Sequence, residues 1–345
     1  MRAQQIREQI FSQGFKVFHR QPSRNWSSSY IPLNLRGLMV GERLTYSLYL
    51  KISDGEEFKY FPYLEAGEVL EYKWLAPLSR MDIKHLYFQQ TDLEKVLAYL
   101  NNHLQLLEVE GAAQTKKKLF VLGDHLNLTL RQVFAAPRLG PHIKLAEKQV
   151  DRIIEEFQKD KFSPKMVWEI LYRNYSLYNH SVNVCLLGVA MMLFLQKSNR
   201  DSRLLGSAAL FIDLGMTRVP EGILDKSGGL TPEEWEETKK HPLIGKQMLR
   251  CHSALPAEGA QLVMEHHENA DGSGYPGGLS LPRQHPWTRI LRLLDAYDAI
   301  TTFRPYRSAQ TPFAALKCLQ KQEGPRGAIF EPRTLMNFIR FLALA

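Results

Sequence analysis

Single ionisable residues interrupt apolar helical stretches in the C-terminal half of this 345-residue chain. Asp213 follows the apolar run 208–212, and Asp295 follows residues 290–294, which are apolar apart from Arg292. Burying a carboxylate in such surroundings is costly unless it is paired or binds a metal. The fold must therefore bring partners to these carboxylates from other helices.

Two adjacent imidazoles close another apolar stretch. His266 and His267 follow residues 262–264, and a loop with four glycines continues to residue 278. Neutral imidazole is the commonest metal ligand, and glycine lets the backbone approach a ligand closely. A lone His pair before a turn is more often a surface feature. Whether this pair binds a metal therefore depends on the ligands that the rest of the chain supplies.

Four histidines and two aspartates lie at predicted helix ends or inside apolar stretches. Each alone is best explained as a capping or salt-bridging group, but six across five successive helices indicate a common site. A mixed imidazole and carboxylate set suits Fe, Mn or Zn. The six residues are His180, Asp213, His241, His266, His267 and Asp295.

The N-terminal residues 1–110 predict a small α+β domain. Apolar or aromatic residues alternate over 44–52, which indicates a strand, and 58–61 reads as a returning strand. A third short strand is expected at 86–88, and a helix from Leu93 onward. This domain carries no catalytic constellation, so sensing, partner binding and dimerisation stay open for it.

Residues 111–140 change to small and basic residues and are interpreted as a linker. Residues 141–345 then predict an all-α domain, with one apolar stripe over 146–157 and helices at 286–302, 313–320 and 332–342. Thr231, Pro232 and Glu234 have the form of a helix start with a capping box. The apolar run 185–195 is too short for a bilayer and suits a core helix.

Charge and cysteine content narrow the function classes. The net charge is +8, and 116–118 is the one tight basic run, so no nucleic-acid polymer is expected as a partner. Cys185, Cys251 and Cys318 form no CxxC pair, which favours reduced thiols in the cytoplasm. No secretory signal is visible in the first 15 residues.

The order and spacing of these motifs resemble the HD-GYP subgroup of the HD phosphohydrolases, over about half of the chain from Asn179 onward. The matching segments are 179–182, 224–231, 240–245, 266–276, 295–299 and 304–307. The resemblance implies a helical domain with two or three metals, often iron or manganese. It also implies hydrolysis of cyclic di-GMP to a linear dinucleotide or GMP.

Roles follow from the resemblance residue by residue. His180 and Asp295 would hold one metal, Asp213 would bridge two and hold the attacking water, and His241, His266 and His267 would complete the second. Arg304 and Arg307 would face phosphate. Gly274, Tyr275 and Pro276 would shape the ligand pocket, and Asp298 and Asp271 would orient ligands. Ser176 stands where members with three metals carry a Glu, so a third metal is not expected.

The chain departs from the family pattern at three positions close to the predicted metal-binding and phosphate-binding residues. Ile212 replaces the His of the His-Asp pair, Met216 replaces a Lys, and Phe303 replaces an Asp. Isoleucine cannot bind a metal, so one metal position keeps fewer ligands. The Lys that Met216 replaces would contact phosphate, and losing such a contact can lower the rate of hydrolysis by a factor on the order of 10²–10³.

Three hypotheses result. The first is a cyclic di-GMP receptor with weak or lost hydrolysis, holding one or two divalent transition metals per chain, Fe or Mn before Zn. The second is a working phosphodiesterase that uses the intact metal site. The third is a structural interaction protein. We also expect a homodimer, and signalling partners that bind through the N-terminal domain or through the loop of Gly274, Tyr275 and Pro276 (the GYP loop). We do not expect a membrane span.

Overall fold

The computed structural model describes residues 29–53, 58–109, 115–135, 140–159, 164–173, 176–224, 226, 228–251, 255–304 and 307–344. The chain divides into two compact units, Met1–Leu128 and Thr129–Ala345, and each is described here by itself.

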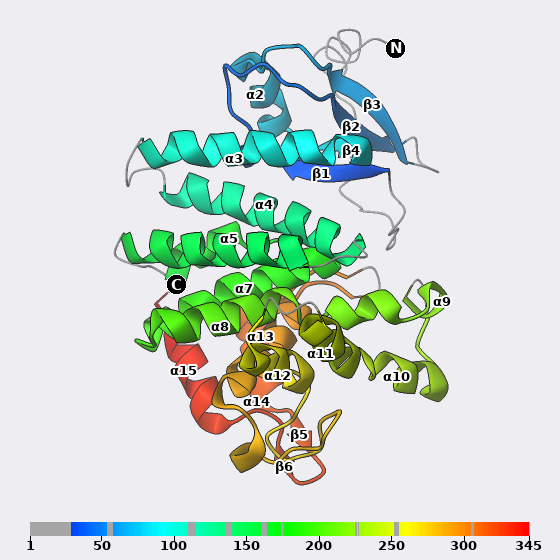
Figure 1. Cartoon of the computed structure of the whole chain (residues 1–345), viewed down its shortest axis with the longest axis vertical. Coiled ribbons are helices and arrows are strands. Elements are labelled where there is room, and N and C mark those ends of the chain that lie inside the picture. The colour runs from blue at the N-terminus through cyan, green and yellow to red at the C-terminus, as the bar shows by residue number, and fades with distance from the viewer. Residues whose placement is uncertain are drawn as a thin grey trace. The chain divides into compact units, whose positions relative to one another are not determined.

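The N-terminal unit is built on a four-stranded antiparallel sheet (Figure 1). The strand order is β1-β4-β2-β3, so the first strand pairs with the last. Alternate residues of β1 and β4, among them Leu33 and Phe88, are buried. The elements are β1 (Tyr30–Asn34), β2 (Leu48–Ser53), β3 (Phe58–Leu64), α2 (Tyr72–Arg80), β4 (His85–Gln89) and α3 (Leu93–Val109), with 3-10 turns η1 (Leu35–Gly37) and η2 (Gln90–Asp92).

The predicted strands are present, with one difference in extent. The strand expected over 44–52 begins only at Leu48. Leu44 and Tyr46 are buried in alternation, but Leu44 pairs its backbone with Glu68 and Gly67 instead of joining the sheet. The turn expected at 53–56 lies mostly outside the described residues. β1 was not predicted, because its partner β4 lies more than 50 residues away along the chain.

Residues 115–135, expected to be part of a linker, form the 21-residue helix α4 (Thr115–Ala135). The composition change marked the lysines at its start, but the residues that follow are apolar at helical spacing. Leu119, Leu122, Leu126, Leu130 and Val133 are all buried. Burial of this stripe makes a helix the favoured conformation.

The C-terminal unit is helical, as expected. Its helices are α5 (Gly140–Lys159), α6 (Pro164–Ile170), α7 (Leu177–Phe194), α8 (Asn199–Leu210), α9 (Glu221–Leu224), α10 (Pro232–Thr238), α11 (His241–Cys251), α12 (Ala257–Glu265), α13 (Pro286–Thr301), α14 (Pro312–Gln320) and α15 (Pro332–Leu342). Turns η4 (Leu214–Arg218) and η5 (Leu281–Arg283) and a hairpin of β5 (Glu323–Gly324) and β6 (Gly327–Ala328) complete it.

Helix α7 lies at the centre of this unit. It packs against α5, α6, α8, α13 and α15 (Figure 1). By length and composition α7 could cross a membrane, but 78% of its apolar window is buried inside the protein. It therefore has the properties of a core helix, and His180 in its first turn is carried into the interior.

Helix α10 begins with the capping box that the sequence predicts. The Thr231 side chain accepts from the Glu234 backbone, and the Glu234 side chain accepts from the Thr231 backbone. Lys226 forms an ion pair with Glu234 at 2.6 Å. These contacts fix the orientation of a helix of only seven residues.

Candidate functional site

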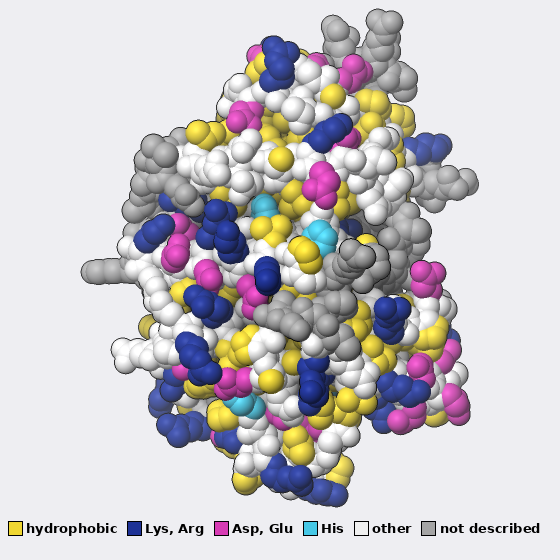
Figure 2. Space-filling view, viewed as in Figure 1, with side chains coloured by type: hydrophobic (Ala, Val, Ile, Leu, Met, Phe, Trp, Pro, Cys, Tyr) yellow, Lys and Arg dark blue, Asp and Glu magenta, His cyan; other side chains and the backbone are white. Residues whose placement is uncertain are grey.

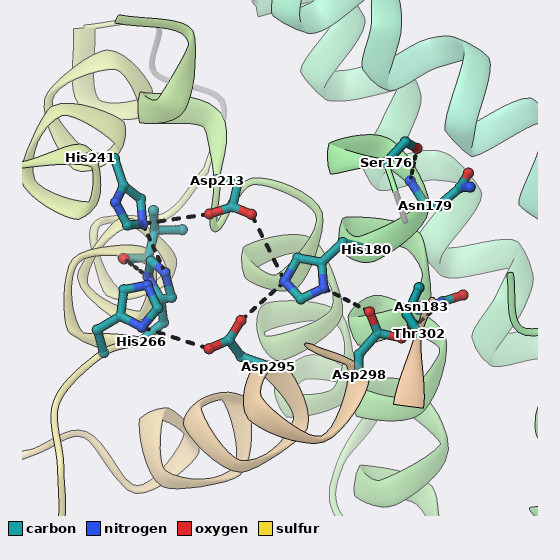
Figure 3. Close-up of polar contacts among 12 residues, drawn as sticks. Ser176, Asn179, His180, Asn183, Asp213, His241, His266, Asp295, Asp298 and Thr302 are labelled. Carbon is teal, nitrogen blue, oxygen red and sulfur yellow. Dashed lines mark hydrogen bonds and ion pairs between the residues drawn. The ribbon is translucent and has the colours of Figure 1, made fainter. Parts of the chain in front are cut away.

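The six predicted residues meet in one closed ring of contacts, and Figure 3 labels His180, Asp213, His241, His266 and Asp295 among them. Going round, His180 Nε2 lies 3.9 Å from Asp213 Oδ2, and Asp213 Oδ1 lies 3.5 Å from His241 Nε2. His241 Nε2 is 3.3 Å from His266 Nε2, and the rings of His266 and His267 are 4.0 Å apart. His267 Nδ1 lies 3.6 Å from Asp295 Oδ2, and Asp295 Oδ1 closes the ring 3.0 Å from His180 Nε2.

The geometry of His241 and His266 favours a cation between them. Their Nδ1 atoms donate to the backbone carbonyls of Thr238 (2.7 Å) and Val263 (2.6 Å). A carbonyl only accepts, so each Nδ1 carries the proton and each Nε2 presents a lone pair. Two lone pairs 3.3 Å apart repel each other unless a positive ion lies near both. The imidazoles of His241, His266 and His267 could together hold a metal ion.

His180 has a different environment. Its Nδ1 donates to Asp298 Oδ2 at 2.7 Å, and its Nε2 lies 3.0 Å from Asp295. Asp298 also accepts from Asn183 (2.7 Å) and Thr302 (3.1 Å). Asp298 therefore holds the His180 imidazole in one orientation on the side away from Asp295.

A close backbone approach brings Asp213 to His241. Gly215, two residues after Asp213, lies so near α11 that an added Cβ would be 2.0 Å from the His241 carbonyl oxygen. Only glycine fits such an approach without moving the backbone. The turn η4 can thus lie directly on the start of α11, which puts the Asp213 carboxylate beside the imidazole.

Burial and charge set the protonation of the ring. Burial lowers the pKa of His241 and of His266 to about 4, so both are neutral near pH 7. For His180, burial acts in the same direction, but hydrogen bonds to Asp295 and Asp298 outweigh it and raise its pKa well above the ordinary value. Burial would raise the pKa of Asp295, but the hydrogen bond from His180 and nearby imidazole charges hold it well below its usual range.

One side of the ring reaches solvent. The side chains of Asp213, Asp295 and His267 are 14%, 13% and 20% exposed, whereas those of His180 and His241 are 3% exposed. A ligand must therefore approach over the two carboxylates and His267.

The GYP loop is packed directly on the ring. Tyr275 lies 4.7 Å from the His267 ring at 32°. Gly274 permits this, because a Cβ there would meet the His267 carbonyl oxygen at 2.4 Å. The next residue is Pro276, and the peptide between it and Tyr275 is cis. Buried Glu268 accepts from the backbone of Gly277 (2.6 Å) and Leu279 (2.8 Å) and fixes the far end of the loop.

Asp271 organises the loop itself. It accepts from the backbone and hydroxyl of Ser273 at 2.9 and 2.6 Å, and from the backbone of Arg326 in the β5–β6 turn at 3.3 Å. Its contacts therefore join the GYP loop to the β5–β6 turn.

The two predicted phosphate-facing arginines differ in placement. The charge of Arg304 is near enough to lower the pKa of Asp213, which burial, the larger effect, raises. Arg307 instead donates to the carbonyl of Ala299 near the end of α13. Pro305 and Tyr306 between them lie outside the described residues. Arg304 is therefore the better placed of the two for a ligand.

Arg292 belongs to the site and was not predicted. Its guanidinium lies 3.8 Å from Asp295 Oδ2, and its Nε donates to Asn269 at 3.1 Å. Arg292 and Asp295 are three residues apart and share one face of α13. The signal was present in the sequence, since Arg292 interrupts the same apolar stretch that drew attention to Asp295.

Apolar side chains occupy the three positions where the chain departs from the family pattern, and Ser176 occupies the position of the third-metal Glu. Ile212 is fully buried and Met216 is half-buried. Phe303 is 37% exposed. Ser176 caps α7 by accepting from the Asn179 backbone at 3.0 Å. None of these side chains can ligate a hard divalent metal as a His or a carboxylate would.

Comparison with known proteins finds a domain match for the part of the chain that carries this site. Residues 167–326 match the family described as HD domain. The C-terminal unit carries an HD domain. The resemblance to the HD-GYP subgroup and the helical fold expected from it are confirmed.

Named relatives support the assignment of this domain. A cyclic di-GMP phosphodiesterase of Pseudomonas aeruginosa is 33% identical over 48% of this chain and 39% of its own. The cyclic di-GMP phosphodiesterase response regulator RpfG of Xanthomonas campestris is 37% identical over 41% of this chain and 37% of its own. The chain thus matches less than half the length of these two relatives.

A solved structure shares the fold more widely. The chain superposes on Bd1817, an HDG"Y"P protein from Bdellovibrio bacteriovorus, with a TM-score of 0.68 over 91% of this chain and 99% of that one. The sequence identity is 18%, so this likeness concerns the fold alone.

Proposed function

We propose that the HD domain of this chain binds cyclic di-GMP at a metal held by His241, His266 and His267, with hydrolysis weak or lost. The relatives named as cyclic di-GMP phosphodiesterases support the ligand. The converging Nε2 atoms of His241 and His266 support the metal. A bound divalent metal supplies Lewis acidity toward a phosphoryl oxygen and toward water.

The observation that carries this proposal is the difference between the two halves of the ring. In the three-histidine half, His241 and His266 turn the lone pairs of their Nε2 atoms toward each other at 3.3 Å. In the other half, both nitrogens of His180 already face carboxylates, and Arg292 lies beside Asp295. Fully buried Ile212 adds no ligand there. The negative charge in this half is thus already balanced by side chains.

The remaining residues suit binding better than turnover. Arg304 brings positive charge toward Asp213 and would contact a phosphate. Tyr275 covers one face of His267 and offers an aromatic surface beside the metal position. Met216 provides no cation where the family has one, so charge developing on phosphate has less stabilisation.

The second candidate is a working phosphodiesterase. The closed ring favours it, because all six remaining ligand positions converge despite the change at Ile212. In this reading water would complete the weaker metal position. In either case the resemblance to the HD-GYP subgroup favours Fe or Mn over Zn as the metal.

Metal content and hydrolysis measured on one anaerobic preparation test the proposal. We expect about one metal per chain, cyclic di-GMP binding by calorimetry, and no linear product above the level of H266A. His142 on α5 provides the matched control, since H142A should retain metal and ligand. Sustained turnover that H266A abolishes would establish the second candidate. Absence of binding by the metal-loaded chain would reject both in favour of an interaction protein.

A further inference from the structure

We propose that Trp235 is a base-contacting residue, and that its indole stacks on a purine ring of the cyclic dinucleotide held at the metal site. This inference rests on the proposed function and adds to it how the purine part of the ligand is recognised.

A row of aromatic rings leads from the metal site to the surface. Tyr275 lies 4.7 Å from the ring of His267, and Trp235 lies 6.1 Å from Tyr275 at 79°. Trp235 remains 46% exposed. An edge-to-face contact at one side leaves the indole with free surface, so this large aromatic side chain stays in solvent beside a candidate ligand site.

The helix that carries Trp235 also orients a metal ligand. Thr238 in the last turn of α10 accepts from His241 Nδ1 at 2.7 Å. The Trp235 side chain contacts Tyr275, which in turn lies on the ring of His267. The indole therefore lies on the side of α10 that faces the GYP loop, and the capping box and the Lys226–Glu234 ion pair hold α10 in place.

The chemistry of a cyclic dinucleotide fits this arrangement. Its phosphates need the metal and a cation such as Arg304, whereas its bases are planar and separated from phosphate by a ribose. The solvent-facing side of the ring, with Asp213, Asp295 and His267, is where phosphate can enter. The exposed aromatic surface two ring contacts from the site then meets a base. Stacking on an aromatic side chain accepts any base, because every base has a π face.

A purely structural role for Trp235 makes a different prediction. If the indole served only to brace Tyr275 or α10, its loss would disturb the imidazoles and weaken every ligand of the metal site alike. If it contacts a base, its loss weakens only ligands that have one.

The test compares two probes on the full Mn²⁺-loaded chain by calorimetry: cyclic di-GMP, which has purines, and inorganic phosphate, which has none. We expect W235A to weaken cyclic di-GMP binding by about 5- to 100-fold and to leave phosphate binding unchanged. W235F should retain most of the affinity. Cyclic di-GMP should quench tryptophan fluorescence in the wild type and in W287F, but not in W235F.

The outcomes distinguish a failure of the proposed cyclic di-GMP binding from a failure of the proposed base contact of Trp235. If the wild type does not bind cyclic di-GMP, the proposed function fails and this inference falls with it. If the wild type binds and W235A binds equally well, or if W235A weakens phosphate to the same extent, only the inference is overturned. Should W235A unfold, the fluorescence comparison between W235F and W287F still decides.

Discussion

The Nδ1 atom of His180 lies 2.7 Å from Oδ2 of Asp298, and both groups are almost fully buried. This pair joins the core helix α7 to α13 and sets which nitrogen of His180 faces the ring. Asp298 thus acts on the site through another residue, and its effect can be measured.

We predict that D298N weakens metal binding. The amide keeps the size of the side chain but removes the negative charge that orients the His180 imidazole, and loss of such an orienting group typically costs about 10- to 100-fold in metal affinity. Titration with Mn²⁺ checks this. Because the three-histidine site is separate, the loss should concern the second, weaker equivalent of Mn²⁺, which the His180 half takes up only when the metal is in excess. A loss confined to the first equivalent would contradict the assignment of His180 to the other half of the ring.

Proton release distinguishes one half of the ring from the other. At pH 6.5 His241 and His266, with pKa values of about 4, are already neutral, whereas the pKa of His180 is raised and its ring is protonated. The first equivalent of Mn²⁺ should therefore release almost no protons, and a second should release about one. Calorimetry in two buffers with different ionisation heats measures this number. A whole proton with the first equivalent would place that metal at His180.

Metal-free protein should lose stability as the pH falls. The pKa values of His241 and His266 are lower in the folded chain than the ordinary 6.5. Below pH 6.5 the unfolded chain therefore binds more protons, and the free energy of unfolding falls until about pH 4. His180 adds no slope in this window, because its raised pKa leaves it protonated in both states. Denaturant melts in EDTA provide the measurement, and H241Q should reduce the slope by about one proton. An unchanged slope in H241Q would refute the assignment.

Restoring the family residues should raise hydrolysis. I212H adds an imidazole beside Asp213, and M216K adds a cation, so the double variant should exceed the wild type by on the order of 10²–10³ in kcat. Each single variant serves as a control for the other. Thermal melts must accompany the assay, because Ile212 is fully buried and a His there can strain the core. A stable, metal-loaded double variant with no gain would locate the defect elsewhere.

Much of the ring was predictable because its members break a hydrophobic pattern. Asp213 and Asp295 stand out in apolar stretches, and the spacing of the histidines completed the set. The same reasoning would have found Arg292, which interrupts the stretch before Asp295. Gly274 and Tyr275 both contact His267, and their expected role in shaping a ligand pocket stays a prediction.

Other features of the site and the fold could not be predicted from the sequence. The carbonyls of Thr238 and Val263 orient two imidazoles, but every residue has a carbonyl, so only the fold shows which are used. Strand β1 and helix α4 were missed for a similar reason, since distant pairing and burial outweigh local composition. Whether Asp271 or Arg307 faces a ligand depended on side-chain directions that spacing does not fix.

Helix α10 carries two residues that bear on the site. The Thr238 carbonyl accepts from His241, and Trp235, three residues earlier, is the proposed contact for a base. A rigid segment of this kind transmits displacement from one end to the other. Occupancy by nucleotide and occupancy by metal should accordingly influence each other, and by thermodynamic reciprocity the factor by which each tightens or loosens the other must be the same.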